Sequence, residues 1–241
     1  MPAYLISIVL ESVSSPVESF SLRYAQTLVH IIHLSQEASN HKTLTPQNPA
    51  TKRFLFHRGV FTVELWRTMN LQDAINQRRS IRTYKNQPLP QGTVEALLEA
   101  ARQAPSAGNV QPWAFVVAET AQTKQALSAA AYKQKDIVEA SAVIVVCADE
   151  ARAEERYGAR GKTLYCLQDT AAAIQNLLLT ACSMGLGTCW IGAFKEAEVR
   201  KVIRAPTHMR PVAFIAVGYP NEAPHPRGRR PINEITHKET F

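Results

Sequence analysis

Residues 162–184, KTLYCLQDTAAAIQNLLLTACSM, do most to decide the fold of this chain. Apolar residues recur there at alternating steps of three and four, as on one face of a helix: Leu164, Leu167, Ala171, Ile174, Leu178 and Ala181. Leu177 and Leu179 widen that face, so we expect the helix to be buried on more than one side. Four polar residues argue against a membrane span: Gln168, Asp169, Gln175 and Asn176. We therefore predict a core helix that also meets another subunit.

Helices and strands are expected to alternate on both sides of this segment. Apolar periodicity predicts helices at residues 71–77, 94–103, 120–130 and 195–204, the second of them capped by Thr93. Apolar runs predict strands at residues 114–118, 142–147 and 212–217, and a short strand after Gly187. The run Ala142–Cys147 is apolar throughout, which is typical of a central strand buried on both faces.

A compact basic segment, Arg78-Arg79-Ser80-Ile81-Arg82, follows the first of these helices. A planar guanidinium matches two phosphate oxygens at once, and a serine hydroxyl adds a neutral donor at short range. Further arginines recur near the C-terminus at Arg227, Arg229 and Arg230. A solvated basic helix end is the alternative interpretation, and the segments downstream favour a phosphate site.

Two of these downstream segments suit the close approach of a ligand. Residues 104–113, APSAGNVQPW, disfavour regular structure and can aim backbone donors and short polar side chains at a ligand. Residues 185–194, GLGTCWIGAF, combine a helix stop, a short strand and a turn of small residues where a backbone can approach a flat ring. Gly185 and Gly187 follow a predicted helix and do not open one, so they do not indicate a dinucleotide-binding fingerprint.

In this order and spacing, the motifs resemble the nitroreductase family of FMN-dependent NAD(P)H oxidoreductases. The resemblance runs from about Met69 to near the C-terminus and includes the RRSIR segment, the PSAGNVQPW loop, the GLGTCWIGAF turn and the arginine-rich tail. It implies an α+β sandwich, with a mixed, mainly antiparallel sheet flanked by helices, in a homodimer with a flavin at each interface. It also implies FMN as cofactor and NADH or NADPH as electron donor.

The same resemblance implies which residues bind the flavin. The first binding segment contributes Arg78, Arg79, Ser80 and Arg82, and the tail contributes Arg227 and Arg229. The phosphate is expected to lie against Arg78, Ser80 and the two tail arginines. The partner chain contributes Pro105, Ser106, Ala107 and Asn109. Gln134 is a further candidate for a contact with the isoalloxazine ring, although the residues around it fit the family only loosely.

Arg82 has the expected electrostatic role. Reduction of a flavin places negative charge on its N1/C2=O edge, and a permanent cation there stabilises that charge. In the family, a backbone N–H of the small-residue turn points at N5, which corresponds to Gly192 or Ala193 here. No side chain is expected to act as a general acid or base, because the cofactor supplies the chemistry.

Composition agrees with a compact domain that binds an anion. The chain has 241 residues, of which 46% are hydrophobic, and a net charge of +7. Nucleic acid is not expected, because the arginines form two separate clusters without alternating aromatic residues. The four cysteines have no CxxC spacing, so we expect no metal site and interpret them as buried thiols in a reducing cytoplasm. Neither a secretory signal nor a long uncharged span is recognisable.

Residues 1–68 differ in character from the rest of the chain. Residues 35–52 are mostly polar and contain Pro46 and Pro49, and the apolar bursts at 4–10 and 27–34 sustain no long period. One hypothesis is that residues 1–68 are an extension outside the catalytic fold, the product of an upstream start codon, and that residues 69–241 form the FMN-binding domain. The competing hypothesis is an appendage that wraps the partner subunit.

Three classes of function remain open. The first is a flavoenzyme that passes electrons from NADH or NADPH to nitroaromatic, quinone or related acceptors by a ping-pong mechanism. The second is a specialised relative that destroys flavin or removes halogens reductively, which would need an added lid. The third is a non-catalytic basic binding protein.

Overall fold

The structure is a computed structural model, and it describes residues 5–8, 53–57, 60–64 and 69–241. The chain divides into two units, Met1–Thr68 and Met69–Phe241. In the first unit, β1 (Leu5–Ile8), β2 (Arg53–His57) and β3 (Val60–Glu64) pair antiparallel in the order β1-β3-β2. The apolar burst at 27–34 and the polar stretch at 35–52 lie outside the described residues.

The second unit is built on a four-stranded sheet in the order β4-β5-β7-β6. Its strands are β4 (Trp113–Ala118), β5 (Ala142–Asp149), β6 (Gly187–Ile191) and β7 (Met209–Gly218). All three neighbouring pairs run antiparallel. Parallel pairing within this unit is limited to one isolated bridge, between Ser80 and Thr188 of β6.

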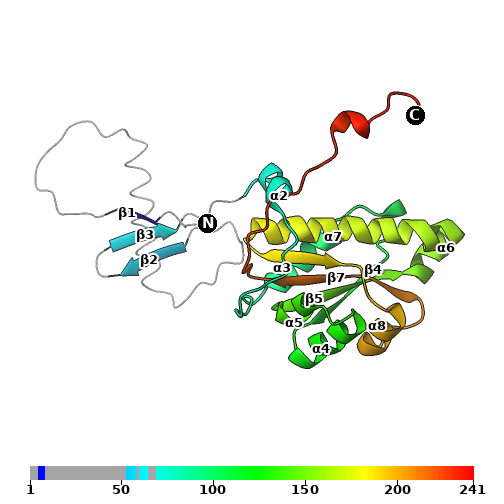
Figure 1. Ribbon diagram of the computed structural model, residues 1–241, viewed down its shortest axis with the longest axis horizontal. Coiled ribbons are helices and arrows are strands. Elements are labelled where there is room, and N and C mark those ends of the chain that lie inside the picture. The colour runs from blue at the N-terminus through cyan, green and yellow to red at the C-terminus, as the bar shows by residue number, and fades with distance from the viewer. Residues whose placement is uncertain (1–4, 9–52, 58–59, 65–68) are drawn as a thin grey trace, which may run out of the picture. The chain divides into compact units, whose positions relative to one another are not determined.

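Helices cover both faces of this sheet (Figure 1). One layer contains α3 (Thr93–Arg102) and α7 (Cys166–Ser183), which pack against Ile144, Val146 and Ile215. The other layer contains α4 (Ala121–Ala130), α5 (Lys135–Glu139) and α8 (Glu196–Ile203), which pack against Val143, Val145 and Phe214. Successive residues of β5 therefore enter opposite cores, as its unbroken apolar run predicts.

The long helix begins later than its sequence predicts. Gly161–Tyr165 form a π-helical turn before α7, and α6 (Glu150–Arg160) precedes that turn. Gly158 interrupts α6 at φ 57° and ψ −149°, a backbone conformation that only glycine readily adopts. No helix was predicted at α6, because charged residues dominate its sequence and the break at Gly158 obscures its period.

Apart from α5, at which no helix was predicted, the remaining helices correspond closely to the expected ones. The helix predicted at residues 71–77 is confirmed as α2 (Leu71–Gln77). Thr93 was wrongly predicted to cap α3, because Gly92 occupies the N-cap at φ 82° and Thr93 is the first helical residue. Short 3-10 turns lie at Ala107–Asn109 and Ile232–Glu234.

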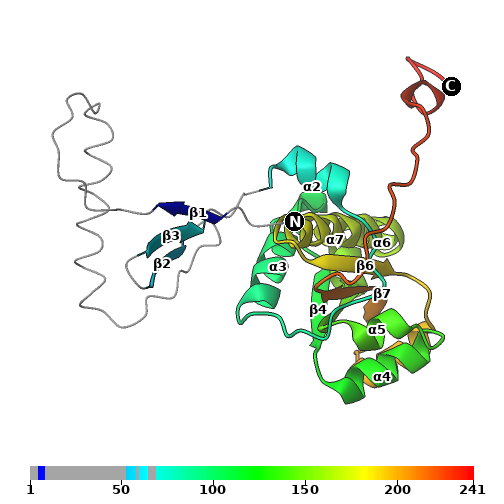
Figure 2. The ribbon, with the colours of Figure 1, turned by 60° about the vertical axis from the view of Figure 1, so that its left-hand side comes forward.

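The chain leaves the sheet after β7. Figure 2 shows this C-terminal segment running outward, away from the helices and strands of its own unit. Within the described part of the chain, no helix has both the length and the apolar character needed to cross a bilayer.

Candidate functional site

The basic segment 78–82 lies beside the start of β6. Ser80 forms its bridge with Thr188, and the Ile81 N–H donates to the Thr188 carbonyl across 2.9 Å. Ile81 is buried, whereas Arg82 is exposed. The edge of the sheet therefore holds the backbone of the basic segment in place.

Glu222, which follows β7 in the sequence, binds the backbone of this segment. Its carboxylate accepts hydrogen bonds from the N–H groups of Arg82 and Thr83, the second at 3.2 Å. Among the described residues, no carboxylate lies within ion-pairing distance of the guanidinium of Arg78 or Arg82. Cations held in place without an internal counterion suit the phosphate and the electron-rich ring edge of FMN.

The basic segment also adjoins the C-terminal part of α7. Cys182 Sγ on α7 lies 3.9 Å from Met69 Sδ, just before α2. Burial raises the pKa of the Cys182 thiol, and the nearby Arg78 and Arg79 lower it. The arginines therefore lie near this end of the helix.

The predicted flavin loop, residues 105–109, lies at the other end of α7. The Ala107 N–H donates to Oδ1 of Asp169, in the first turn of α7, at 3.1 Å. Asp169 and Cys182 are separated by about 20 Å along the helix, at 1.5 Å per residue. Figure 1 shows α2 and α6 beside opposite ends of α7. A single chain thus keeps its two predicted flavin segments well apart.

Two other predicted site residues meet in space. Gln134 Nε2 donates to the carbonyl oxygens of Ala131 and Ala193, each at 2.9 Å. The turn at Gly192 and Ala193 is exposed, and a Cβ at Gly192 would meet no atom within 4 Å. The turn is therefore held from one side and open on its outer surface, which suits the approach of a flat ring.

Among the described residues, no hydrogen bond joins the tail arginines to the basic segment 78–82. Arg227 and Arg229 are exposed, and Arg229 Nη1 donates to the Arg227 and Gly228 carbonyls at 3.2 and 3.1 Å. Across the described part of the chain, every hydrogen bond found for residues 223–241 stays within that tail.

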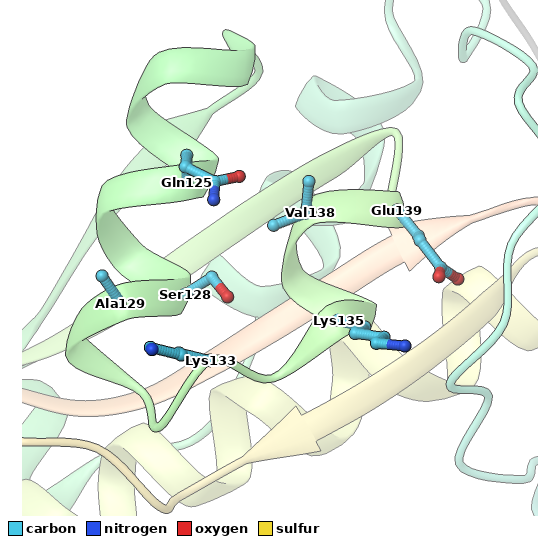
Figure 3. A pocket seen from close by; sticks show the side chains of 7 residues that line it. All are labelled: Gln125, Ser128, Ala129, Lys133, Lys135, Val138 and Glu139. Atoms are coloured by element: carbon cyan, nitrogen blue, oxygen red, sulfur yellow. The ribbon is translucent and has the colours of Figure 1, made fainter.

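An open pocket of about 510 Å³ lies between α4 and α5 (Figure 3). It is lined by Gln125, Ser128, Ala129, Lys133, Lys135, Val138 and Glu139. None of these is a predicted flavin residue. The Lys133 and Lys135 side chains point in opposite directions in Figure 3, so they do not converge on one anion.

Asp169 and Glu222 are functional candidates that sequence reasoning missed. Asp169 was interpreted only as a polar residue within an apolar helix, and its burial at 8% exposure is the signal that marks it. Glu222 contacts residues about 140 positions away, so no local pattern reveals it.

Comparison with known proteins agrees with this architecture. Residues 75–143 and 130–219 match the sequence profile of the nitroreductase family. An NADH dehydrogenase of Thermus thermophilus is 32% identical over 194 residues, covering 69% of this chain and 95% of that protein. An FMN reductase (NADPH) of Bacillus subtilis is 28% identical, covering 71% of this chain and 74% of that protein.

Solved structures show the same fold. The crystal structure of a putative NADH oxidase from Clostridium acetobutylicum is 34% identical, with a TM-score of 0.60 over 70% of this chain and 99% of that one. An antiparallel sheet between two helical layers, shared with this solved structure, defines a protein of the nitroreductase fold. The chain belongs to the nitroreductase family of FMN-dependent NAD(P)H oxidoreductases.

Proposed function

We propose that this chain passes electrons from NADH or NADPH to a small-molecule acceptor, a nitroaromatic, a quinone or a related compound, by a ping-pong mechanism. The observation that carries this proposal is that the backbone of the 78–82 segment is anchored beside β6, while no described carboxylate pairs with the guanidinium of Arg78 or Arg82. FMN supplies the electron-transfer chemistry when bound. Donor and acceptor would use the open side of the turn at Gly192 and Ala193 in succession.

Arg78 and Ser80 would hold the phosphate. Arg79 is already engaged, because its Nη1 donates to the Asn76 carbonyl at 2.6 Å and to the Arg78 carbonyl at 2.9 Å. It therefore stiffens the segment after α2, while the Arg78 guanidinium and the Ser80 hydroxyl supply charge and a neutral donor.

Arg82 would stabilise negative charge at the pyrimidine edge of the ring. A cation near this edge stabilises the negative charge as it develops. The Glu222 carboxylate binds the backbone of Arg82, which leaves the side chain free for this role.

Gly192 and Ala193 would present backbone N–H groups to the ring. Gln134 donates to the Ala193 carbonyl and so holds the Ala193–Phe194 peptide, which directly follows these two N–H groups. Gln134 would thus act on the turn, in addition to the direct ring contact that its family position implies.

We further propose a homodimer in which Pro105, Ser106, Ala107 and Asn109 contact the flavin of the partner. Two segments that lie at opposite ends of α7 on one chain meet at a single flavin ring when a second chain supplies one of them. Leu179 and Ala171 on α7 are only half-buried within one chain, so this side of the helix is available to a second copy. The exposed tail leaves Arg227 and Arg229 available to a phosphate as well.

We place the protein in the cytoplasm. All four cysteines are free thiols, and burial raises the pKa of both Cys147 and Cys189 to about 11. Such thiols pack as small hydrophobic groups, as is usual in a reducing compartment.

We also propose that residues 69–241 are the catalytic unit. The family match at residues 75–219 lies wholly within the second unit. A chain that begins at Met69 should bind FMN and turn over normally. Insoluble or flavin-free protein would instead favour an appendage that wraps the partner.

Steady-state oxidation of NADH and NADPH, with quinone and nitroaromatic acceptors in parallel, tests the proposed function. We expect parallel lines in double-reciprocal plots, the signature of a ping-pong mechanism. Intersecting lines would contradict that mechanism. Loss of flavin absorbance that reoxidation does not restore, or release of halide during turnover, would favour the specialised class of relatives.

A further inference from the structure

Asp169 is a buried carboxylate that the proposed function leaves unused. It lies in the first turn of α7 with 8% of its surface exposed. Oδ1 accepts the Ala107 N–H at 3.1 Å, and Oδ2 has no hydrogen-bond partner among the described residues. Burial raises the pKa of this carboxyl, and the Ala107 N–H lowers it.

A carboxylate is a poor choice for packing alone at this position. A buried oxygen without a partner costs free energy that an apolar residue of similar size would avoid. Departures of this kind from good packing concentrate at functional sites. The one bond that Asp169 makes leads directly into the loop with the PSAGN sequence.

That loop has a backbone that needs external support. Gly108, Asn109 and Gln111 have positive φ angles of 53°, 58° and 54°. Non-glycine residues adopt this region at a cost, and they keep it where surrounding contacts require it. Within the loop, the Gln111 N–H donates to Ser106 Oγ at 3.0 Å.

Two neighbouring helices hold the loop from outside. Arg152 Nε on α6 donates to the Val110 carbonyl at 2.6 Å, after the 3-10 turn. Asp169 on α7 holds the Ala107 N–H, at the first residue of that turn. Asp169 therefore controls where the turn begins, and with it the direction of Ser106, Ala107 and Asn109.

We propose that Asp169 is a positioning residue that aims the loop Pro105–Asn109 at the flavin. The inference rests on the flavin contact assigned to this loop under the proposed function. Asp169 acts through the Ala107 N–H and does not itself touch cofactor or substrate. Because the donor is a neutral amide and the acceptor is charged, this bond is stronger than a neutral one.

Three variants isolate this bond. Asp169→Ala removes the acceptor, and Asp169→Asn retains a carbonyl oxygen in its place. Ala107→Pro removes the donor without changing α7. The backbone suits proline there, because Ala107 is the first residue of the 3-10 turn and Ser106 before it is extended at φ −143° and ψ 155°. Asn176→Ala is the matched control, because Asn176 Nδ2 on the same helix donates to the Ala100 carbonyl of α3 at 3.2 Å and makes no hydrogen bond to residues 105–109 among those described.

The readouts are the FMN and riboflavin dissociation constants and hydrogen exchange of the loop amides in flavin-free protein. In Asp169→Ala and Ala107→Pro we expect both ligands to weaken by similar factors of about tenfold, since the loop is assigned to the ring and not to the phosphate. Hydrogen exchange of the loop amides should become faster in both variants. Asp169→Asn should recover most of the FMN affinity. The double variant should bind FMN no more weakly than either single variant. Asn176→Ala should change neither affinity nor loop exchange.

Several outcomes would overturn the inference. Unchanged affinity in folded Asp169→Ala and Ala107→Pro would do so, as would additive losses in the double variant. If Asp169→Ala fails to fold, an unaffected Ala107→Pro decides against the inference by itself. A wild-type protein that binds neither FMN nor riboflavin would instead overturn the proposed function, and the aim of the loop with it.

Discussion

The side-chain amide of Gln134 donates a hydrogen bond to the backbone carbonyl of Ala193 across 2.9 Å, joining residues 59 positions apart. Gln134 is also the N-cap residue of α5, and Ala193 follows the edge strand β6. The bond therefore ties the helical layer that contains α4 and α5 to the turn proposed to face the flavin.

Replacing Gln134 should loosen that turn. A neutral hydrogen bond of this kind contributes about 1 kcal/mol, so Gln134→Ala should lower flavin affinity or slow flavin reduction about fivefold. Gln125→Ala is the control, because Gln125 is exposed on α4 and lines only the open pocket. Stopped-flow reduction at saturating FMN measures the effect. Identical rates together with identical flavin dissociation constants in the two variants would remove Gln134 from the site.

Replacing Arg78 should weaken the binding of FMN much more than the binding of riboflavin. A charge-assisted contact is worth about 1.5 to 3 kcal/mol, so Arg78→Ala should weaken FMN binding about tenfold or more. Riboflavin lacks the phosphate, and its affinity should change far less. Equal losses for the two ligands, measured by fluorescence titration, would show that Arg78 does not bind the phosphate.

Replacing Arg82 should affect chemistry more than binding. Arg82→Ala should slow flavin reduction even at saturating FMN, because the fixed cation at the ring edge is lost. Rapid mixing of FMN-loaded protein with NADH or NADPH gives the rate. An unchanged rate would leave the electrostatic mechanism without its proposed residue.

Stability should depend on pH through Asp169. The pKa of the Asp169 carboxyl is higher in the folded protein than in the unfolded chain. The free energy of unfolding therefore falls as the pH rises from the unfolded pKa to the folded pKa. Asp169→Asn does not titrate, and its stability relative to wild type should therefore increase from acidic to neutral pH. Urea unfolding at several pH values measures this difference. A difference that stays constant with pH would show that the carboxyl is not perturbed by burial.

Two neighbouring leucines of α7 should behave differently. Leu178 is 4% exposed in the core of its own chain, so Leu178→Glu should unfold the protein whether or not it dimerises. Leu179 is half-buried, and Leu179→Glu should weaken the dimer and release FMN while the chain stays folded. Sedimentation with absorbance at a flavin wavelength follows both properties. A stable Leu179→Glu dimer would place the interface elsewhere.

Sequence periodicity predicts those parts of the fold that depend on local pattern. The unbroken apolar run of β5 and the three- and four-residue spacing of α7 both reflect burial, and both elements are found in the structure. Thr120 caps α4 with its side chain, as a hydroxyl at a helix start often does. The α6 helix has no such signal, because a glycine-only conformation at Gly158 interrupts a charged sequence.

Site residues are predictable where they form a contiguous motif. The arginines of the 78–82 segment and the loop before Trp113 were proposed in this way, and their role in flavin binding stays a prediction. The hydrogen bonds from Arg82 to Glu222 and from Gln134 to Ala193 were not predicted, because each joins residues that are far apart in the sequence. Spacing along the chain carries no information on such pairs.

The bridge between Ser80 and Thr188 has a consequence for solubility. β6 is an edge strand, and unpaired N–H and C=O groups on an edge are a template for pairing with another chain. The basic segment occupies part of that edge through the bond from the Ile81 N–H to the Thr188 carbonyl. It also places like charges there, which repel an approaching strand. The same five residues that are proposed to bind the cofactor thus protect the sheet against aggregation, and a change that detaches them would put both at risk.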